Sequence, residues 1–367
     1  MNRKQLPLMI GAILAGGAGL AQADVTLFGQ IDNSYVFEDQ DGGDDGSNFE
    51  CTTCSLGFKG SEDLGNGLKA IFQLDFQYNI DARNPKKTKT LKTITTGGGK
   101  STVTLNTGVE TQSAITDRDQ WLGLAGGFGQ VRVGTISTTY KSHGAMIDPL
   151  YRTSQQNRDR GVQSNMHTGA GASGQGRAEN TARYDSPSWN GLKAAATYTI
   201  SPDDENDGDN GYGAGISYEN AGILVFADYI TNDTGKDDSA YKLGGKYTLN
   251  NLSVYGQYEF DKGLISSKTP DTSGEGADLW MLGASYTLGN SMVYLSYGTS
   301  DNGSNGSKLS SYNVWELVGT HNMSKRTKLY AGFSEIDCDD QDDNVCSQVG
   351  KKAGEDDKFS LGMQHQF

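Results

Sequence analysis

Four cysteines in two close pairs offer the clearest chemistry in the sequence. Cys51 and Cys54 stand in the stretch Cys-Thr-Thr-Cys, and Cys338 and Cys346 lie together in a second acidic stretch. In an exported chain, pairs this close predict local disulfides in loops. A redox or zinc site is the alternative, but no helical pattern follows Cys54 and no histidine lies close to either pair. We therefore expect the bridges Cys51–Cys54 and Cys338–Cys346, with a crossed pairing between the two loops as the other arrangement.

The remaining reactive residues lack the spacing that catalysis or cofactor binding requires. Three acidic runs, DQDGGDD, DDENDGD and CDDQDD, could offer carboxylates to calcium, but none keeps the Gly and Glu positions of an EF-hand loop. The stretch GGGKS ends like a phosphate-binding loop, but Ile94 stands where the first glycine is needed. No G-x-S-x-G occurs, and the histidines are scattered, at His143, His167, His321 and His365. We expect no cofactor, no metal and no enzymatic activity.

The N-terminal segment predicts export. Arg3 and Lys4 precede an apolar run over 6–20, and a cleavage site of small residues, Ala-Gln-Ala, ends at position 23. We interpret residues 1–23 as a cleaved signal peptide and 24–367 as one mature domain; a membrane-anchoring helix is the alternative. The apolar run is too short for a spanning helix, and no other stretch approaches ~20 apolar residues.

Composition narrows the class of protein. Removal of the two positive charges at Arg3 and Lys4 takes the formal net charge from -14 to -16, which argues against binding to nucleic acid. Only 35% of the residues are hydrophobic, yet the chain has 18 Tyr, 12 Phe and 50 Gly. It is too aromatic for a disordered chain and too polar for an ordinary core of this length. A wall with an apolar outside and a polar inside fits both facts.

Sixteen segments show the alternation of β-strands. In the segment 67–78, Leu74 and Phe76 face one way, whereas Asp75 and Gln77 face the other. The expected strands cover 25–37, 54–61, 67–78, 117–125, 129–136, 180–186, 191–200, 212–219, 222–231, 239–248, 251–261, 277–288, 291–299, 310–321, 326–336 and 357–367.

The connections alternate between short turns and long polar loops. A soluble β-sandwich would also alternate within its strands. Three features favour a closed membrane barrel: the even strand count, the alternating connections, and the five mature prolines, all of which fall in connections. The sequence therefore predicts an all-β, 16-stranded antiparallel transmembrane barrel with short periplasmic turns and long extracellular loops. The last strand ends at Phe367 and has to pair with the first, because a membrane sheet leaves no open edge.

Five stretches resemble one known family. VTLFGQIDNSY, SLGFKGSEDLGNGLKAIFQLD, RDQWLGLAGGFGQVRVGT, TARYDSPSWNGLKAAATY and the terminal Phe367 are similar to the general porins of Gram-negative outer membranes, of the Neisseria and Burkholderia type. The resemblance implies an outer-membrane homotrimer in which each barrel holds a water-filled pore for ions and small hydrophilic solutes. It also implies that Phe367 belongs to the signal read by the barrel assembly machinery, and that lipids and lipopolysaccharide surround the barrel.

The same resemblance implies where the pore is narrowest. The family's third long loop folds into the lumen, and here that loop is about 137–179. Basic wall residues face it in the family, and these match Arg118 and Arg183, whereas a further family arginine is here Ser55 and a lysine of some relatives is Gln30. The two departures reduce the expected positive wall.

Alternation and loop charge complete the expected constriction. Arg132 lies between two valines, so alternation alone points it into the lumen. We expect Asp148 to face the arginines across the pore, and the charged residues of the inward loop include Asp148, Arg152, Arg158 and Arg160. This excess of positive charge predicts a weak anion preference. A barrel hydrolase and a calcium-dependent surface adhesin are the alternative functions.

Overall fold

The structure of the chain is a computed structural model. It describes residues 24–40, 45–78, 86–95, 102–111, 115–167, 176–200, 210–232, 238–265, 278–300, 311–338, 345–346, 351–352 and 354–367. The signal peptide expected over 1–23 and most of the long acidic loops lie outside these residues.

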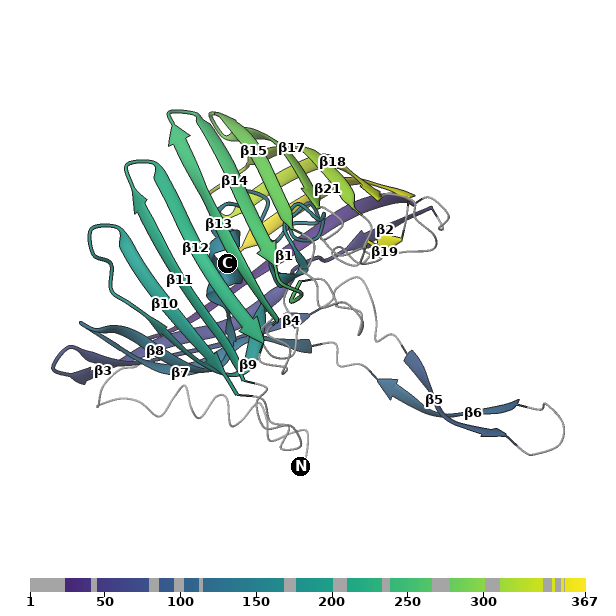
Figure 1. Cartoon of the computed structure of the whole chain (residues 1–367), viewed down its shortest axis with the longest axis horizontal. Helices are drawn as coiled ribbons and strands as arrows, with labels where there is room; N and C mark the ends of the chain where they lie inside the picture. The colour runs from purple at the N-terminus through teal and green to yellow at the C-terminus, as the bar shows by residue number, and fades with distance from the viewer. Residues whose placement is uncertain are drawn as a thin grey trace.

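Sixteen antiparallel strands close into a barrel (Figure 1). The first, β1 (Asp24–Gln40), pairs with β3 (Ser55–Gly65) on one edge and with the last, β21 (Gly354–Gln366), on the other. Each remaining strand pairs with its neighbours in this ring. They are β4 (Leu68–Tyr78), β7 (Ile115–Gly126), β8 (Gly129–Ser137), β9 (Arg177–Asp185), β10 (Leu192–Thr199), β11 (Gly211–Asn220), β12 (Ile223–Asn232), β13 (Asp238–Leu249), β14 (Leu252–Asp261), β15 (Leu279–Leu288), β16 (Ser291–Ser300), β17 (Tyr312–Asn322) and β18 (Thr327–Cys338).

The predicted fold class is confirmed, and each of the sixteen predicted segments coincides with a strand of the barrel. Additional strands occur inside the expected loops. One of them, β2 (Gly46–Glu50), extends the sheet beside β1. A hairpin of β5 (Lys86–Thr95) and β6 (Thr102–Thr111) projects away from the barrel in Figure 1. The last two are β19 (Val345–Cys346) and β20 (Lys351–Lys352).

Short turns follow from local sequence. Between β3 and β4, Asn66 and Gly67 have φ angles of 53° and 77°, and between β9 and β10, Asn190 and Gly191 have φ angles of 52° and 95°. Both central residues of a type I′ hairpin turn need positive φ, which Asn-Gly adopts at little cost. These dipeptides therefore close hairpins at one end of the barrel.

The strand alternation separates an apolar outer face from a polar inner face. On β16, the side chains of Val293 and Leu295 are 49% and 53% exposed, whereas Tyr294 and Ser296 are buried. Among the described residues, most exposed large apolar side chains lie on the barrel strands in this way. An apolar outer surface of this kind fits a lipid environment and would be unstable in water.

The connection between β8 and β9 fills much of the inside of the barrel. It carries α2 (Thr139–Met146), which begins at the N-cap Thr138, and the short helix η1 (Asn165–His167). Apolar side chains of this segment pack against wall side chains to form the main hydrophobic cluster, with Ile147 and Leu150 fully buried. Within the described residues, no helix combines the length and apolarity that a membrane crossing requires.

The chain end completes the closure of the sheet. The N–H of Gly29 donates to the carbonyl of Phe367 over 3.2 Å, and the N–H of Phe367 donates to the carbonyl of Gly29 over 3.1 Å. The ring of Phe367 lies over Gly29 so closely that a Cβ added there would be 2.5 Å from the ring. Residue 367 thus covers a glycine on the first strand, a pairing that stabilises glycine positions in sheets.

Replacement of Phe367 by Asp tests the role of this residue. The ring contact is lost and a charge is placed near the rim, which costs about 0 to 1 kcal/mol of folded-state stability at an interface. We expect the yield in the outer membrane to fall several-fold while the melting of the assembled fraction changes little. Phe367→Tyr, which keeps the ring, is the matched control. An undiminished yield of Phe367→Asp would contradict a role in assembly.

Candidate pore constriction

Polar side chains fasten the inward segment to the wall. The amide of Gln155 donates to the Oγ of Ser360 on β21 over 3.0 Å, and the hydroxyl of Tyr312 on β17 donates to the carbonyl of Gly161 over 2.7 Å. Each of these side chains is fully buried. The path of the segment across the lumen is therefore set by contacts with strands far away in sequence.

Arg160 is one of these fastenings and does not line an open passage. Its side chain is 1% exposed, its Nε donates to the Oγ of Ser334 over 2.6 Å, and its Nη2 donates to Asp356 over 2.9 Å. A buried arginine needs such partners, because an unpaired buried charge is strongly destabilising. The prediction that Arg160 lines the constriction is therefore wrong. Arg160 instead joins the inward segment to β18 and β21.

A second polar cluster holds α2 against the opposite wall. Lys242 on β13 donates to the carbonyl of Tyr140 and lies 3.4 Å from Asp228 on β12. The Nδ1 of His143 is 2.8 Å from the same Asp228, and the hydroxyl of Tyr140 donates to Glu259 on β14. Lys242, Asp228 and Glu259 were not predicted from the sequence as site residues. Alternation along the predicted strands could have placed these three side chains on the inner face. It could not have shown which of the charged groups contact one another.

Each predicted wall arginine has a carboxylate partner. On β7, Arg118 lies 2.9 Å from Asp75 on β4. On β9, Arg183 lies 2.7 Å from Asp185, and Arg132 on β8 pairs with the same Asp185. The guanidinium of Arg132 also lies 5.0 Å from the ring of Trp121.

These arginines are half-buried or buried on the inner face. Arg183 also reaches the inward segment, where its Nη1 donates to the carbonyl of Ser137 over 2.6 Å and to the Oγ of Ser142 over 3.0 Å. A fourth such pair joins Arg177 to Asp119 over 3.2 Å; Arg177 falls within the range 137–179 expected for the inward loop, but it is the first residue of β9. The inner wall therefore carries ion pairs more than isolated positive charges.

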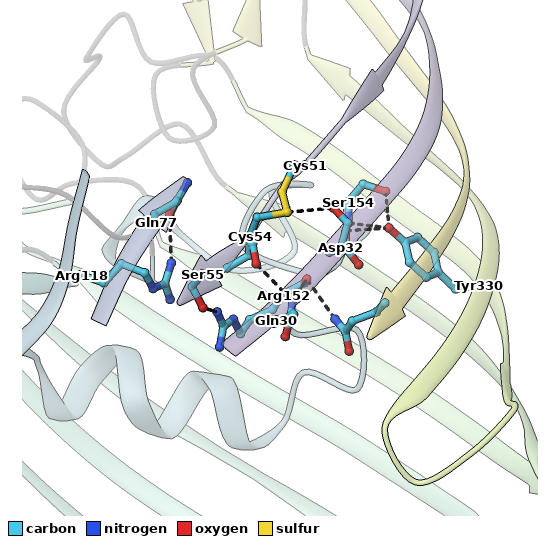
Figure 2. The surroundings of a disulfide bond; sticks show 12 residues. Gln30, Asp32, Cys51, Cys54, Ser55, Gln77, Arg118, Arg152, Ser154 and Tyr330 are labelled. Atoms are coloured by element: carbon cyan, nitrogen blue, oxygen red, sulfur yellow. Dashed lines mark hydrogen bonds between the residues drawn. A yellow bond between two sulfur atoms is a disulfide. The ribbon is translucent and has the colours of Figure 1, made fainter. Parts of the chain in front are cut away.

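The loop arginines differ in their surroundings. The Nη1 of Arg158 donates to the carbonyl of His167 over 3.1 Å, and its guanidinium lies 4.9 Å from the ring of Tyr151. Arg152 instead reaches the wall, where its Nη2 donates to the Oγ of Ser55 over 2.5 Å (Figure 2). Ser55 is the position at which the family resemblance leads one to expect an arginine. The positive group absent from that strand is thus supplied next to it by the loop.

The bridge predicted between Cys51 and Cys54 is present, but it does not lie at a loop tip. It interrupts the strand pairing to β1: β2 pairs with residues 34–38, β3 pairs with residues 24–30, and the bridge lies between them. Cys54 is fully buried, and its Sγ lies 3.6 Å from the carbonyl of Asp32 (Figure 2).

The bridged turn thus belongs to the barrel wall and immediately precedes Ser55. Cys338 is also disulfide-bonded. The side chain of Cys346 lies outside the described residues.

Asp148 departs from its expected place. Its Oδ1 accepts the N–H of Leu150 over 2.9 Å, and its Oδ2 accepts the N–H of Asn157 over 3.1 Å. It therefore closes a turn of the inward segment and does not face the wall arginines. Burial raises the pKa of Asp148 to about 7, although these N–H donors and the positive charge of Arg158 oppose the shift.

A closed antiparallel barrel, apolar outside and lined inside by charged pairs around an inward segment, defines the porin-like class of membrane barrels. The sequence profile of the Gram-negative porins matches residues 11–341. The match covers most of the chain, so the chain belongs to the Gram-negative porin family.

Curated relatives agree with this assignment. The chain is 31% identical over 236 residues to the major outer membrane protein P.IB of Neisseria gonorrhoeae, a match that covers 60% of this chain and 55% of that protein. It is 31% identical over 231 residues to P.IB of Neisseria lactamica, covering 60% of this chain and 57% of that protein. The chain thus aligns with little more than half the length of these relatives.

Solved structures show the same fold. An anion-selective porin from Comamonas acidovorans has a TM-score of 0.69 and 24% sequence identity, with 94% of this chain and 100% of that chain covered. OmpF of Salmonella typhi has a TM-score of 0.64 and 18% identity, with 94% and 97% covered. At these identities the similarity concerns the fold.

The raised pKa of Asp148 predicts a pH dependence. The carboxyl is mostly charged at pH 8 and mostly neutral at pH 6, so acidification removes one negative charge from the inward segment. We expect the reversal potential across a salt gradient to move toward anion preference between pH 8 and pH 6. Asp148→Asn should reduce that movement, because it removes the contribution of this carboxyl. If Asp148→Asn responds to pH as the unchanged protein does, another group is responsible.

Proposed function

We propose that the chain forms a water-filled channel for passive diffusion of ions and small hydrophilic solutes across the outer membrane. The observation that carries the proposal is the charged inner wall, narrowed by a segment that is fastened to several strands. A porin performs no reaction; it needs a hydrated passage whose side chains suit polar solutes. The channel has no enzymatic activity in this proposal.

Ion pairs on the wall set the field in the passage. Pairs such as Arg118 with Asp75 and Arg183 with Asp185 place fixed opposite charges next to each other on the inner face. Such charges orient water and favour polar over apolar solutes, and their balance sets the ion preference.

Selectivity depends on which charges an ion meets where screening is weakest. The chain is acidic overall, with a formal charge of -14, which by itself suggests a cation channel. Exposed charges are largely screened beyond ~8 Å at physiological ionic strength. Near the constriction water is scarcer, so a few fixed charges outweigh many at the mouth. The basic residues of the inward segment therefore favour a weak anion preference at high salt, which drifts toward cations on dilution.

Assembly and export complete the proposal. The chain is exported by the signal peptide 1–23, inserted by the barrel assembly machinery with the help of Phe367, and assembled as a homotrimer among lipids and lipopolysaccharide. Family membership supports these steps. A protein of similar fold, OmpT of Vibrio cholerae, is described in a trimer form. The acidic runs on which a calcium-dependent adhesin would depend lie largely outside the described residues.

Planar-bilayer recording tests the channel. The detergent-solubilised protein should give stepwise, ohmic currents in multiples of three, because three pores insert together. Heating to the monomer before reconstitution is the control and should abolish the steps. A barrel that inserts but stays closed, or that hydrolyses ester or peptide substrates, would contradict the proposal.

Removal of the two wall arginines tests selectivity. The double variant Arg118→Gln/Arg183→Gln leaves Asp75 and Asp185 without these partners, so the wall becomes more negative. The reversal potential should move toward cation preference at every salt concentration, with the permeability ratio changed several-fold. A reversal potential unmoved at high salt would show that these arginines do not act at the constriction, even if the channel remains.

A further inference from the structure

The main chain at Arg152 forms hydrogen bonds with two wall side chains and with one side chain of its own segment. Its carbonyl accepts the side-chain amides of Gln30 on β1 over 2.9 Å and of Gln364 on β21 over 3.1 Å. Its N–H donates to the Oε1 of Gln156 over 3.0 Å. Arg152 has a φ of 67°, a left-handed backbone conformation that residues other than glycine rarely adopt. Such a conformation persists only where surrounding contacts determine it, as they do here.

The side chain of Arg152 is equally fixed but is not neutralised. Its Nη2 donates to Ser55 over 2.5 Å, and its Nε is buried without a hydrogen-bond partner. The residue as a whole remains partly exposed. In the part of the chain that the structure describes, no carboxylate forms an ion pair with it. Ser55 and the two glutamines that hold it are all uncharged, so they position the guanidinium without cancelling its charge.

The other arginines around the passage lie within 4 Å of a carboxylate. The pairs are Arg118 with Asp75, Arg132 and Arg183 with Asp185, Arg158 with Asp159, Arg160 with Asp356, and Arg177 with Asp119. The field of a close ion pair falls off faster with distance than that of a single charge. A passing ion therefore responds more to one unpaired guanidinium than to any of these pairs.

Lys141 is a further cation of this region, and its Nζ is buried without a hydrogen-bond partner among the described residues. Burial and the neighbouring arginines lower the pKa of Lys141 well below its usual value, which favours the neutral amine. Burial also lowers the pKa of Arg152, but only to about 10, so its guanidinium is charged at neutral pH.

We infer that Arg152 is a specificity-determining residue of the channel, and that Ser55, Gln30 and Gln364 form the wall site that positions its charge. This inference rests on the proposed channel function. The inward segment thus narrows the passage and also places a positive charge next to Ser55, where the strand itself carries none.

Arg152→Gln removes the charge and retains a polar side chain. In a tenfold salt gradient at neutral pH, we expect the anion-to-cation permeability ratio to fall about threefold, as estimated for one charge ~7 Å from the ion path and partly screened. Arg326→Gln is the matched control: it removes the same charge from an exposed turn next to β18 and should leave the ratio unchanged. Two measurements verify that both variants fold: circular dichroism shows the strand content, and native trimers are present that dissociate only on heating.

Moving the charge back to the strand is the sharper test. In Ser55→Arg/Arg152→Gln the guanidinium starts from β3 and ends in the same region of the wall, so the permeability ratio should return toward that of the unchanged protein. If stepwise conductance persists but Arg152→Gln keeps the original ratio, this inference is wrong and the channel function stands. A double variant that stays as low as Arg152→Gln would refute the wall site. If the unchanged protein gives no stepwise conductance, the proposed function itself is refuted.

Discussion

Complete backbone pairing is the constraint on which the rest of this structure depends. Within a bilayer no water is available to bond a free N–H or C=O, so the sheet has to close. Closure is reached by pairing β1 with both β3 and β21, and it is completed by the reciprocal hydrogen bonds of Gly29 and Phe367. Once the wall is closed, one face of every strand meets lipid and the other encloses a lumen, and the apolar and polar faces follow from that geometry.

The lumen brings a second problem, because charged side chains are crowded into a confined space. The wall solves it by pairing, as in Arg118 with Asp75 and Arg183 with Asp185. Paired charges keep the passage polar without a large net field. An unpaired charge in such a setting has a disproportionate effect, since little counter-charge and little water surround it. The selectivity proposed above therefore depends less on the number of arginines than on which of them lack a carboxylate.

Much of the fold was predictable from local pattern. Alternation found all sixteen barrel strands, because each strand has one lipid face and one lumen face and the side-chain period of two is preserved along it. The pattern missed β2, because its five residues belong to an acidic stretch with little apolar alternation. It also placed the Cys51–Cys54 bridge in a loop, since only the pairing on either side reveals that the bridge interrupts a strand.

The sequence by itself determined the class of protein, the number of strands and the inward direction of Arg132, since these depend on periodicity and composition. Tertiary structure decided which charges meet. Asp148 was expected to face the arginines but closes its own turn, and Arg160 became a buried fastening. Arg152 reaches Ser55 although 97 residues separate them. Such contacts depend on the path of a loop through the lumen, and that path is set by long-range hydrogen bonds that leave no periodic trace in the sequence.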